Sequence, residues 1–203
     1  GALTSYIVGA CALLFILEIT SALGAGGSNG FEALMNVPAE ILFQMGARSG
    51  IMIGRGEWWR LFVPVFLHGG ILHILFNGMA LVQVGPLAEQ AYGRSRFLII
   101  FIVSGVMGNV LGVFLNDPRG VGIGASGALF GLIGAAGLYG HRRGDTFGLM
   151  IRRVMVQWGL YALVFGFLMH ADNAAHIGGL VSGVVLSFLV GDAERHSPLD
   201  RIW

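Results

Sequence analysis

Six long apolar runs restrict what this chain can fold into more than any other feature of its sequence. They cover residues 5–23, 69–88, 97–115, 123–140, 149–169 and 173–190, and each has about the 20 residues that a helix needs to cross a bilayer. An open sheet cannot satisfy its backbone hydrogen bonds in lipid, so each run is predicted to be a spanning helix. The prediction is an all-α membrane protein in which residues 1–203 form a single domain, a bundle of six transmembrane helices.

The composition points to the same class. Only 11% of the 203 residues are charged and 55% are hydrophobic, whereas a soluble domain carries about 25% charged residues. The 34 glycines suit membrane helices, which associate through close packing of small residues. We therefore expect membrane lipid around the chain. The net charge of +1 gives no reason to expect nucleic acid as a partner, and no oligomeric state is predicted.

The arginines indicate an orientation. If the N-terminus is inside, eight arginines fall on inside loops and four on outside loops. Because cytoplasmic loops are enriched in basic residues, both termini are predicted to be cytoplasmic.

The first outside connection, residues 24–67, is long for a loop between packed helices. Apolar residues recur in it at helix-like spacing from Phe31 to Met45, and Trp58 and Trp59 follow. Tryptophan is typical of the membrane–water boundary. We expect a partly ordered, interfacial loop; the alternative is a surface loop without fixed structure.

Ser126 stands among small residues at the start of the fourth run, in Gly124-Ala125-Ser126-Gly127. The start of a helix has free backbone N–H groups and the positive end of the helix dipole. Such a place suits a nucleophile whose reaction develops an oxyanion. The alternative is a tightly packed helix start with Ser126 as its cap.

The second run carries His73 and Asn77, which are four residues apart and so lie on one helix face. Both side chains can donate hydrogen bonds toward the bundle interior. His68 lies nearer the outer surface, where an interfacial histidine without a function is at least as good an interpretation.

The sixth run carries His176, followed by Gly179 and Gly183. This small-residue track permits intimate helix contact. A helix carrying His176 is therefore expected to press against the Gly127 and Gly131 face of the helix that carries Ser126.

These polar groups agree in depth. Three helices that enter from the outside each place a catalytic-type group in their outer half, and together they supply a nucleophile, a base and oxyanion donors for acyl transfer. Asp172 lies one turn before His176 and is expected to point to water, which favours a Ser–His dyad over a triad. Glu89, at the inner end of the second run, is expected to bond loop backbone or neighbouring helices.

Other chemistries lack their residues. No His-Glu-x-x-His motif is present, three histidines alone do not specify a metal site, and no pair of intramembrane aspartates is present for an aspartyl mechanism. No metal and no cofactor are predicted.

Taken together, the motifs resemble those of the rhomboid family of intramembrane serine proteases. The resemblance runs from residue 59 to residue 183 and includes the order of the six helices. It rests on Trp59-Arg60, on His73-Ile74-Leu75-Phe76-Asn77, on Glu89-x-x-x-Gly93, on Gly124-Ala125-Ser126-Gly127 and on Ala175-His176-x-x-Gly179-x-x-x-Gly183.

The resemblance implies a role for each residue of the site. Ser126 would be the nucleophile and His176 the general base and acid. His73 and Asn77 would form the oxyanion hole with the backbone N–H of Ser126, and Gly124 would shape that loop. Phe130 departs from the pattern, since many bacterial relatives carry a tyrosine there; it can still pack under His176.

The resemblance also implies transmembrane segments of other proteins as substrates. They would enter laterally, past residues 149–169 and the loop around residues 170–172, with Phe76 lining the route as a substrate gate. A multi-pass protein of the bacterial inner membrane is expected. The alternative function is a non-enzymatic rhomboid-like protein that binds transmembrane helices.

Overall fold

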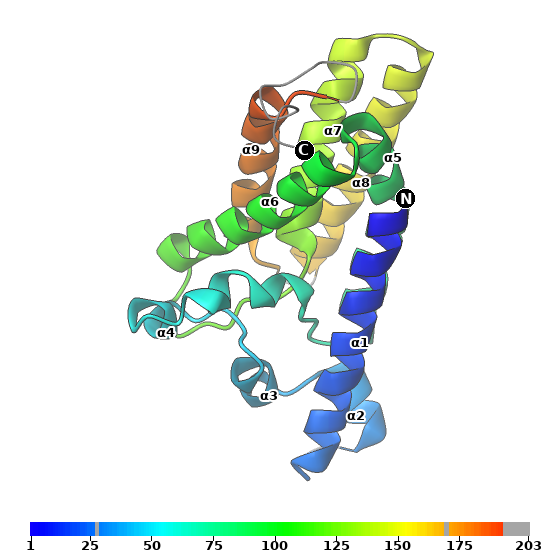
Figure 1. The fold of residues 1–203 in the computed structure, drawn as a ribbon. Coiled ribbons are helices and arrows are strands. Elements are labelled where there is room, and N and C mark those ends of the chain that lie inside the picture. The colour runs from blue at the N-terminus through cyan, green and yellow to red at the C-terminus, as the bar shows by residue number, and fades with distance from the viewer. Residues whose placement is uncertain (27–28, 169–170, 193–203) are drawn as a thin grey trace.

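The computed structural model describes residues 1–26, 29–168 and 171–192, and within these ranges it is helical without strands. The predicted all-α class is confirmed. Figure 1 shows the arrangement. The elements are α1 (Ala2–Gly24), α2 (Gly30–Met35), α3 (Ala39–Gln44), α4 (Gly50–Gly54), the 3₁₀ helices η1 (Trp58–Leu61) and η2 (Val63–Phe66), α5 (Ile71–Tyr92), α6 (Arg94–Leu115), α7 (Ser126–Arg143), α8 (Thr146–Leu168) and α9 (Asn173–Leu189).

Every predicted span falls on a helix. Four helices in the described part of the chain, α1, α5, α6 and α8, are long and apolar enough to cross a membrane. The helix α9 is apolar but shorter, and α7 has 18 residues and ends in His141, Arg142 and Arg143. A bundle in which all six helices cross remains a prediction.

The centre of the bundle depends on glycines in α7 and α9. A Cβ built at Gly179 would overlap the carbonyl oxygen of Gly127, and one at Gly183 would overlap that of Gly131. The two backbones are therefore in direct contact, and the predicted contact between these glycine faces is confirmed. Small residues are what allow membrane helices to approach this closely.

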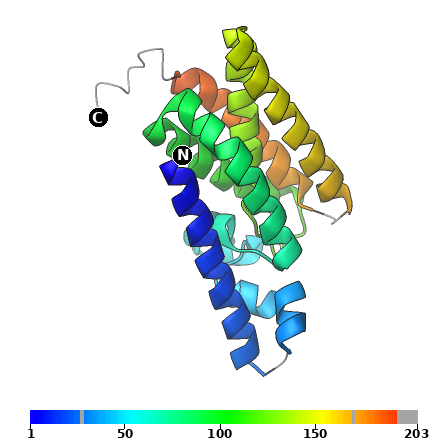
Figure 2. The same cartoon turned by 90° about the vertical axis from the view of Figure 1, so that its right-hand side faces the viewer.

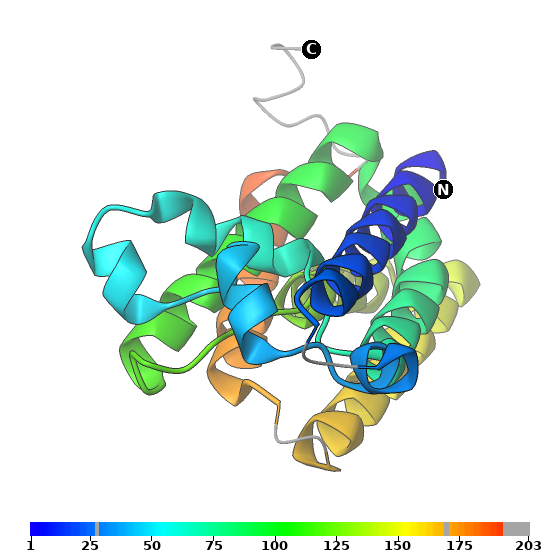
Figure 3. The same cartoon turned by 90° about the horizontal axis from the view of Figure 1, so that it is seen from below.

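The segment predicted as an interfacial loop is folded into short helices. Figures 1 and 3 show α2, α3 and α4 gathered at the end of the bundle where α7 and α9 begin. Leu42, Ala47 and Leu67 from this segment form a small apolar core with Phe15 of α1. Arg60 lies inside the segment, where it donates to the carbonyl oxygens of residues 43 and 47. The location of the 24–67 segment at a membrane interface remains a prediction.

At the opposite end, Glu89 holds the start of α1 against α5, which lie side by side in Figure 2. Its carboxylate accepts hydrogen bonds from the backbone N–H groups of Leu3 and Thr4 and from the Thr4 hydroxyl. These N–H groups belong to the first turn of a helix, where they have no partner within it. The expectation that Glu89 bonds a neighbouring helix is confirmed.

Candidate active site

Ser126 and His176 face each other across the contact between α7 and α9. The Ser126 hydroxyl oxygen lies 2.9 Å from Nε2 of His176, within the range for proton transfer. Ser126 is the first residue of α7, and the capping position before it belongs to Ala125. The alternative that Ser126 serves as the helix cap is therefore not supported by the structure.

The His176 imidazole is buried and held from one side by an aromatic ring. Phe130 of α7 stacks on it with ring centroids 4.5 Å apart and an angle of 24° between the planes. The expected packing of Phe130 under the histidine is thus confirmed. Nδ1 of His176 is buried and has no hydrogen-bond partner among the described residues. Among the described residues, the Phe130 ring packs on this imidazole and no carboxylate bonds its Nδ1.

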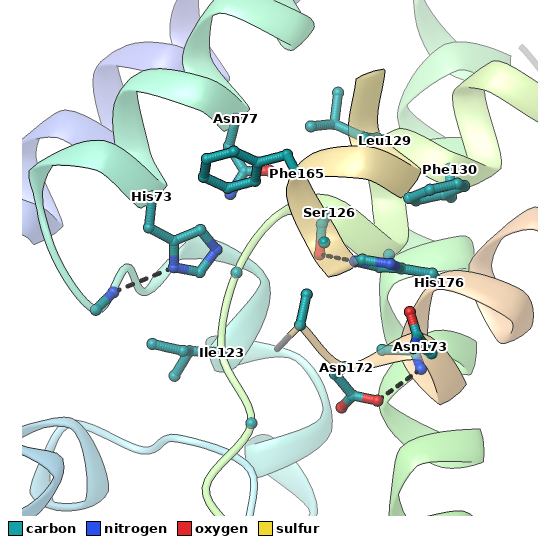
Figure 4. A pocket seen from close by; sticks show the side chains of 18 of the residues that line it. His73, Asn77, Ile123, Ser126, Leu129, Phe130, Phe165, Asp172, Asn173 and His176 are labelled. Carbon is teal, nitrogen blue, oxygen red and sulfur yellow. Dashed lines mark hydrogen bonds between the residues drawn. The ribbon is translucent and has the colours of Figure 1, made fainter. Parts of the chain in front are cut away.

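His73 and Asn77 lie on one face of α5. The chain segment that leads to Ser126 runs between them and His176 (Figure 4). A Cβ built at Gly124 would lie 2.7 Å from Nε2 of His73 and 3.8 Å from Nδ2 of Asn77. Both nitrogens therefore face the space beside the Gly124 α-carbon. That space exists because residue 124 has no side chain and a backbone angle φ of +112°, which favours glycine.

Both side chains can donate a hydrogen bond into this space. Nδ2 of Asn77 is buried without a hydrogen-bond partner among the described residues, and a donor in that state is costly unless a ligand uses it. Nδ1 of His73 accepts the N–H of Gly69 at 3.4 Å. In a neutral imidazole the proton then sits on Nε2, the atom that faces Gly124.

All of these groups line one cavity of about 730 Å³, together with Phe76. Figure 4 shows the side chains converging from α5, α7 and α9 on the segment that precedes Ser126. The structure thus brings together every residue that the sequence singled out for the site.

The expectation that Asp172 points to water is wrong. One carboxylate oxygen lies 2.5 Å from NH1 of Arg48, and only 20% of its side chain is exposed. The other oxygen accepts hydrogen bonds from the Ala175 backbone and the Asn116 amide. Burial alone would raise the pKa of Asp172, but the two hydrogen bonds and the Arg48 charge outweigh it and hold the pKa below its ordinary value. The carboxylate is thus engaged by these partners, which leaves the expectation of a Ser–His dyad in place.

Phe76 contacts α8, the helix past which substrate access is expected. Its ring stacks on Phe165 with centroids 4.0 Å apart and an angle of 4° between the planes, and it meets Trp158 edge-on. Nε1 of Trp158 donates to the Gln83 side chain at 3.3 Å. Side chains of α5 and α8 are therefore in contact at Phe76 and at Gln83. Of the loop also expected on this route, residues 169 and 170 lie outside the described residues.

Sequence reasoning did not identify Arg48, Asn116 or Phe165. Arg48 comes from a segment far from Ser126 in the sequence, Asn116 precedes Ser126 by ten residues, and no motif surrounds either residue. Of the three, only Phe165 could have been noticed from the sequence. It lies eleven residues before His176, in the 149–169 run past which substrate entry is expected.

Comparison with known proteins places the chain in a family. The family model described as "Rhomboid domain" matches residues 55–193. The chain is similar to "Rhomboid protease GluP" of Bacillus subtilis (strain 168), with 36% identity over 181 residues that cover 88% of this chain and 32% of that protein. It is also similar to "Putative rhomboid protease YdcA" of the same organism, with 37% identity over 139 residues, 68% of this chain and 69% of that protein.

A plant relative, "RHOMBOID-like protein 1" of Arabidopsis thaliana, is 34% identical over 165 residues, which cover 73% of this chain and 39% of that protein. The chain thus spans about a third of the length of GluP and about two thirds of that of YdcA. The family match and the four long apolar helices make it an integral membrane protein. With a matching model over more than half of its length, this chain belongs to the rhomboid family.

Proposed function

We propose that this protein is an intramembrane serine endopeptidase that cuts transmembrane segments of other membrane proteins by means of a Ser126–His176 dyad. The observation that carries the proposal is the 2.9 Å contact between the Ser126 hydroxyl and Nε2 of His176, in a cavity that two further hydrogen-bond donors line. The names of the two Bacillus relatives, both called rhomboid proteases, support the same activity.

In the proposed reaction, Nε2 of His176 takes the proton of the Ser126 hydroxyl as its oxygen attacks the scissile carbonyl carbon. The protonated imidazole then gives this proton to the leaving amine as the C–N bond breaks, which leaves an acyl group on Ser126. A water molecule next attacks the acyl carbon and passes its proton to His176. The histidine returns a proton to the serine oxygen, and the new carboxyl end is released.

The oxyanion of each tetrahedral intermediate would be held by Nδ2 of Asn77, Nε2–H of His73 and the backbone N–H of Ser126. The unpartnered Asn77 amide supports this role, since a donor fixed in advance of the reaction needs no reorganisation when charge develops. The Ser126 N–H belongs to the first turn of α7, so no helix carbonyl accepts from it. Gly124 would keep this space free of a side chain.

The substrate would reach the cavity sideways, between α5 and α8. The aromatic contact of Phe76 with Phe165 would have to open, which assigns Phe76 the role of a gate. Bonds inside a stable helix are already hydrogen-bonded, so substrates with helix-weakening residues near their outer ends would be preferred.

The proposal includes the placement of the chain. Residues 1–203 would form one domain with six spans and both termini in the cytoplasm of a bacterial cell, and α2, α3 and α4 would lie at the outer interface. The exposed rings of Trp58 and Trp59, 68% and 55% accessible, suit such an interface. The reaction as proposed uses no metal or cofactor.

A labelling experiment combined with cleavage tests the proposal. Purified wild-type protein in lipid vesicles should react with a fluorophosphonate at Ser126 and should cut a single-span fusion protein. Ser126→Ala should do neither at an unchanged melting temperature. Cleavage by purified Ser126→Ala would refute the mechanism. A folded wild-type protein that neither labels nor cuts, but still binds the fusion protein, would favour the non-enzymatic alternative.

A further inference from the structure

Arg48 and Asp172 form a buried ion pair at the outer end of the bundle. NH1 of Arg48 lies 2.5 Å from the Asp172 carboxylate, and the Arg48 side chain is only 6% exposed. The two residues are far apart in the sequence, and each is connected to one of the two proposed catalytic residues. A buried charge pair of this kind is uncommon, because both charges must be removed from water.

Arg48 is tied through its backbone to the segment that leads to Ser126. Its N–H donates to the carbonyl oxygen of Gly122, and the Gly122 N–H donates back to the carbonyl oxygen of Arg48, at 2.9 and 3.1 Å. Gly124, two residues on, donates its N–H to the carbonyl oxygen of Pro64 at 2.8 Å. The chain on the Ser126 side of the cavity is therefore pinned to the 24–67 segment at two points.

Asp172 is tied to the helix that carries His176. It is the residue before α9, and its side chain accepts the Ala175 N–H at 2.9 Å as a helix cap. The same oxygen accepts the Asn116 amide at 2.8 Å, which connects the cap to the end of α6. His176 follows four residues after Asp172, so the position of this carboxylate sets the position of the first turn of α9.

The surrounding glycines make room for the arginine. A Cβ at Gly112 of α6 or at Gly122 would overlap the Arg48 guanidinium. The side chain thus lies in a slot between two backbones and has little freedom to move. A guanidinium confined in this way limits how far the paired Asp172 carboxylate can move.

From these contacts we infer that Arg48, Asp172, Asn116 and Gly122 form an outer clasp that sets the distance between Ser126 and His176. Arg48 and Asp172 are positioning residues, because they act through the chain before Ser126 and through the first turn of α9. The inference rests on the proposed function. It adds that the 24–67 segment, which contains none of the proposed catalytic groups, controls the rate of the chemical step.

The test compares two ion pairs. Removal of one partner would leave a buried charge unpaired and destabilise the fold, so the main variant is the neutral double substitution Arg48→Met with Asp172→Asn. Asparagine keeps the helix cap. The matched control is Arg143→Met with Asp145→Asn, an ion pair at the opposite end of α7 from Ser126. Nε of Arg143 lies 2.7 Å from the Asp145 carboxylate, and the two side chains are 27% and 48% exposed.

The expected result is a loss in kcat of about 10- to 100-fold for the Arg48 and Asp172 variant, since a misplacement of about 1 Å costs that much. KM should stay within about 2-fold, because substrate binding is not the step affected. The control should keep kcat per folded molecule within about 2-fold, because a partly exposed ion pair contributes little to stability. Equal kcat values in the two double variants would overturn the inference.

Single lysine variants keep the test decisive if the double variant does not fold. Arg48→Lys keeps a positive charge but loses the guanidinium that fills the slot between Gly112 and Gly122, so kcat should fall about 3- to 10-fold, whereas Arg143→Lys should leave it unchanged. Equal rates in these two variants would refute the clasp. Failure of the proposed function would look different, since wild-type protein would then show no Ser126-dependent cleavage at all.

Discussion

Substitution of Gly179 by alanine tests whether direct contact between the α7 and α9 backbones sets the geometry of the site. Gly179 lies three residues after His176, almost one turn further along α9. A Cβ there would overlap the carbonyl oxygen of Gly127, the residue next to Ser126. Neither atom belongs to a flexible side chain, so the overlap can be relieved only if the helices move apart.

The size of this movement follows from ordinary contact distances. A carbon atom and a carbonyl oxygen approach to about 3.3–3.6 Å, so α9 has to shift by more than about 1 Å from α7. The Ser126–His176 distance, now 2.9 Å, would then exceed the roughly 3.2 Å limit for direct proton transfer. A misplacement of this size lowers kcat by about 100-fold, which corresponds to about 2.7 kcal/mol in the activation free energy. Overpacking should also lower the free energy of unfolding by about 1–3 kcal/mol.

The assay is kcat for a single-span fusion substrate in lipid vesicles, with the melting temperature measured on the same preparation. Gly159→Ala in α8 is the control, because a Cβ there would make an ordinary contact of 3.6 Å with Ile133. A folded Gly179→Ala protein with kcat within about 3-fold of the control would contradict the argument, since a 1 Å displacement is expected to cost far more.

Three further predictions concern single side chains. Asn77→Ala should lower kcat about 10²–10³-fold with little change in KM, as expected for a lost oxyanion donor; steady-state kinetics on the same substrate would check this, and an unchanged kcat would remove Asn77 from the oxyanion hole. Phe130→Ala should lower kcat about 2- to 10-fold, because an aromatic pair contributes about 0.5–1.5 kcal/mol. Phe130→Tyr should keep the stacked ring and most of the activity. Equal losses of kcat in both variants would argue against a role for ring stacking on His176. Burial, together with the nearby His73, lowers the pKa of His68 from 6.5 to about 3. Between these pH values the unfolded chain binds more protons than the folded protein, so the free energy of unfolding should fall as pH decreases. Melting temperatures measured from pH 7.5 to pH 4.5 should show this loss of stability in the wild type and a weaker loss in His68→Gln.

Much of the arrangement could be predicted because the lipid environment simplifies the problem. A long apolar run in a membrane protein must be helical, and glycines at spacings of four mark where two such helices meet. Together these rules predict that α7 and α9 are in contact and that Ser126 and His176 lie at similar depth. The contact of Phe130 with His176 was implied by the family resemblance, whereas that of Glu89 with a neighbouring helix was expected from its position at the inner end of the second run.

The burial of Asp172 and its pairing with Arg48 could not be predicted in this way. Its position before α9 indicates a helix cap, and an exposed cap is the ordinary outcome at the surface of a membrane domain. What buries it is Arg48, which arrives from a segment without spanning helices and lies between glycines of two other chain segments. No periodicity or spacing in the sequence indicates that pairing, because it depends on how the short helices fold back over the bundle.

The sequence therefore predicts which residues form the proposed site better than it predicts the distances between them. The proposed reacting groups lie on helices whose depth and facing follow from local sequence patterns, so they can be recognised one motif at a time. By the inference above, the distance between them depends on contacts through which Arg48, Gly122 and Asp172 join segments that are far apart in the chain. If the clasp acts as inferred, a chain can keep every recognisable motif and still lose the chemical step through a change at Arg48. Arg48 is therefore a position in the 24–67 segment at which a substitution should alter the rate without altering any of the motifs.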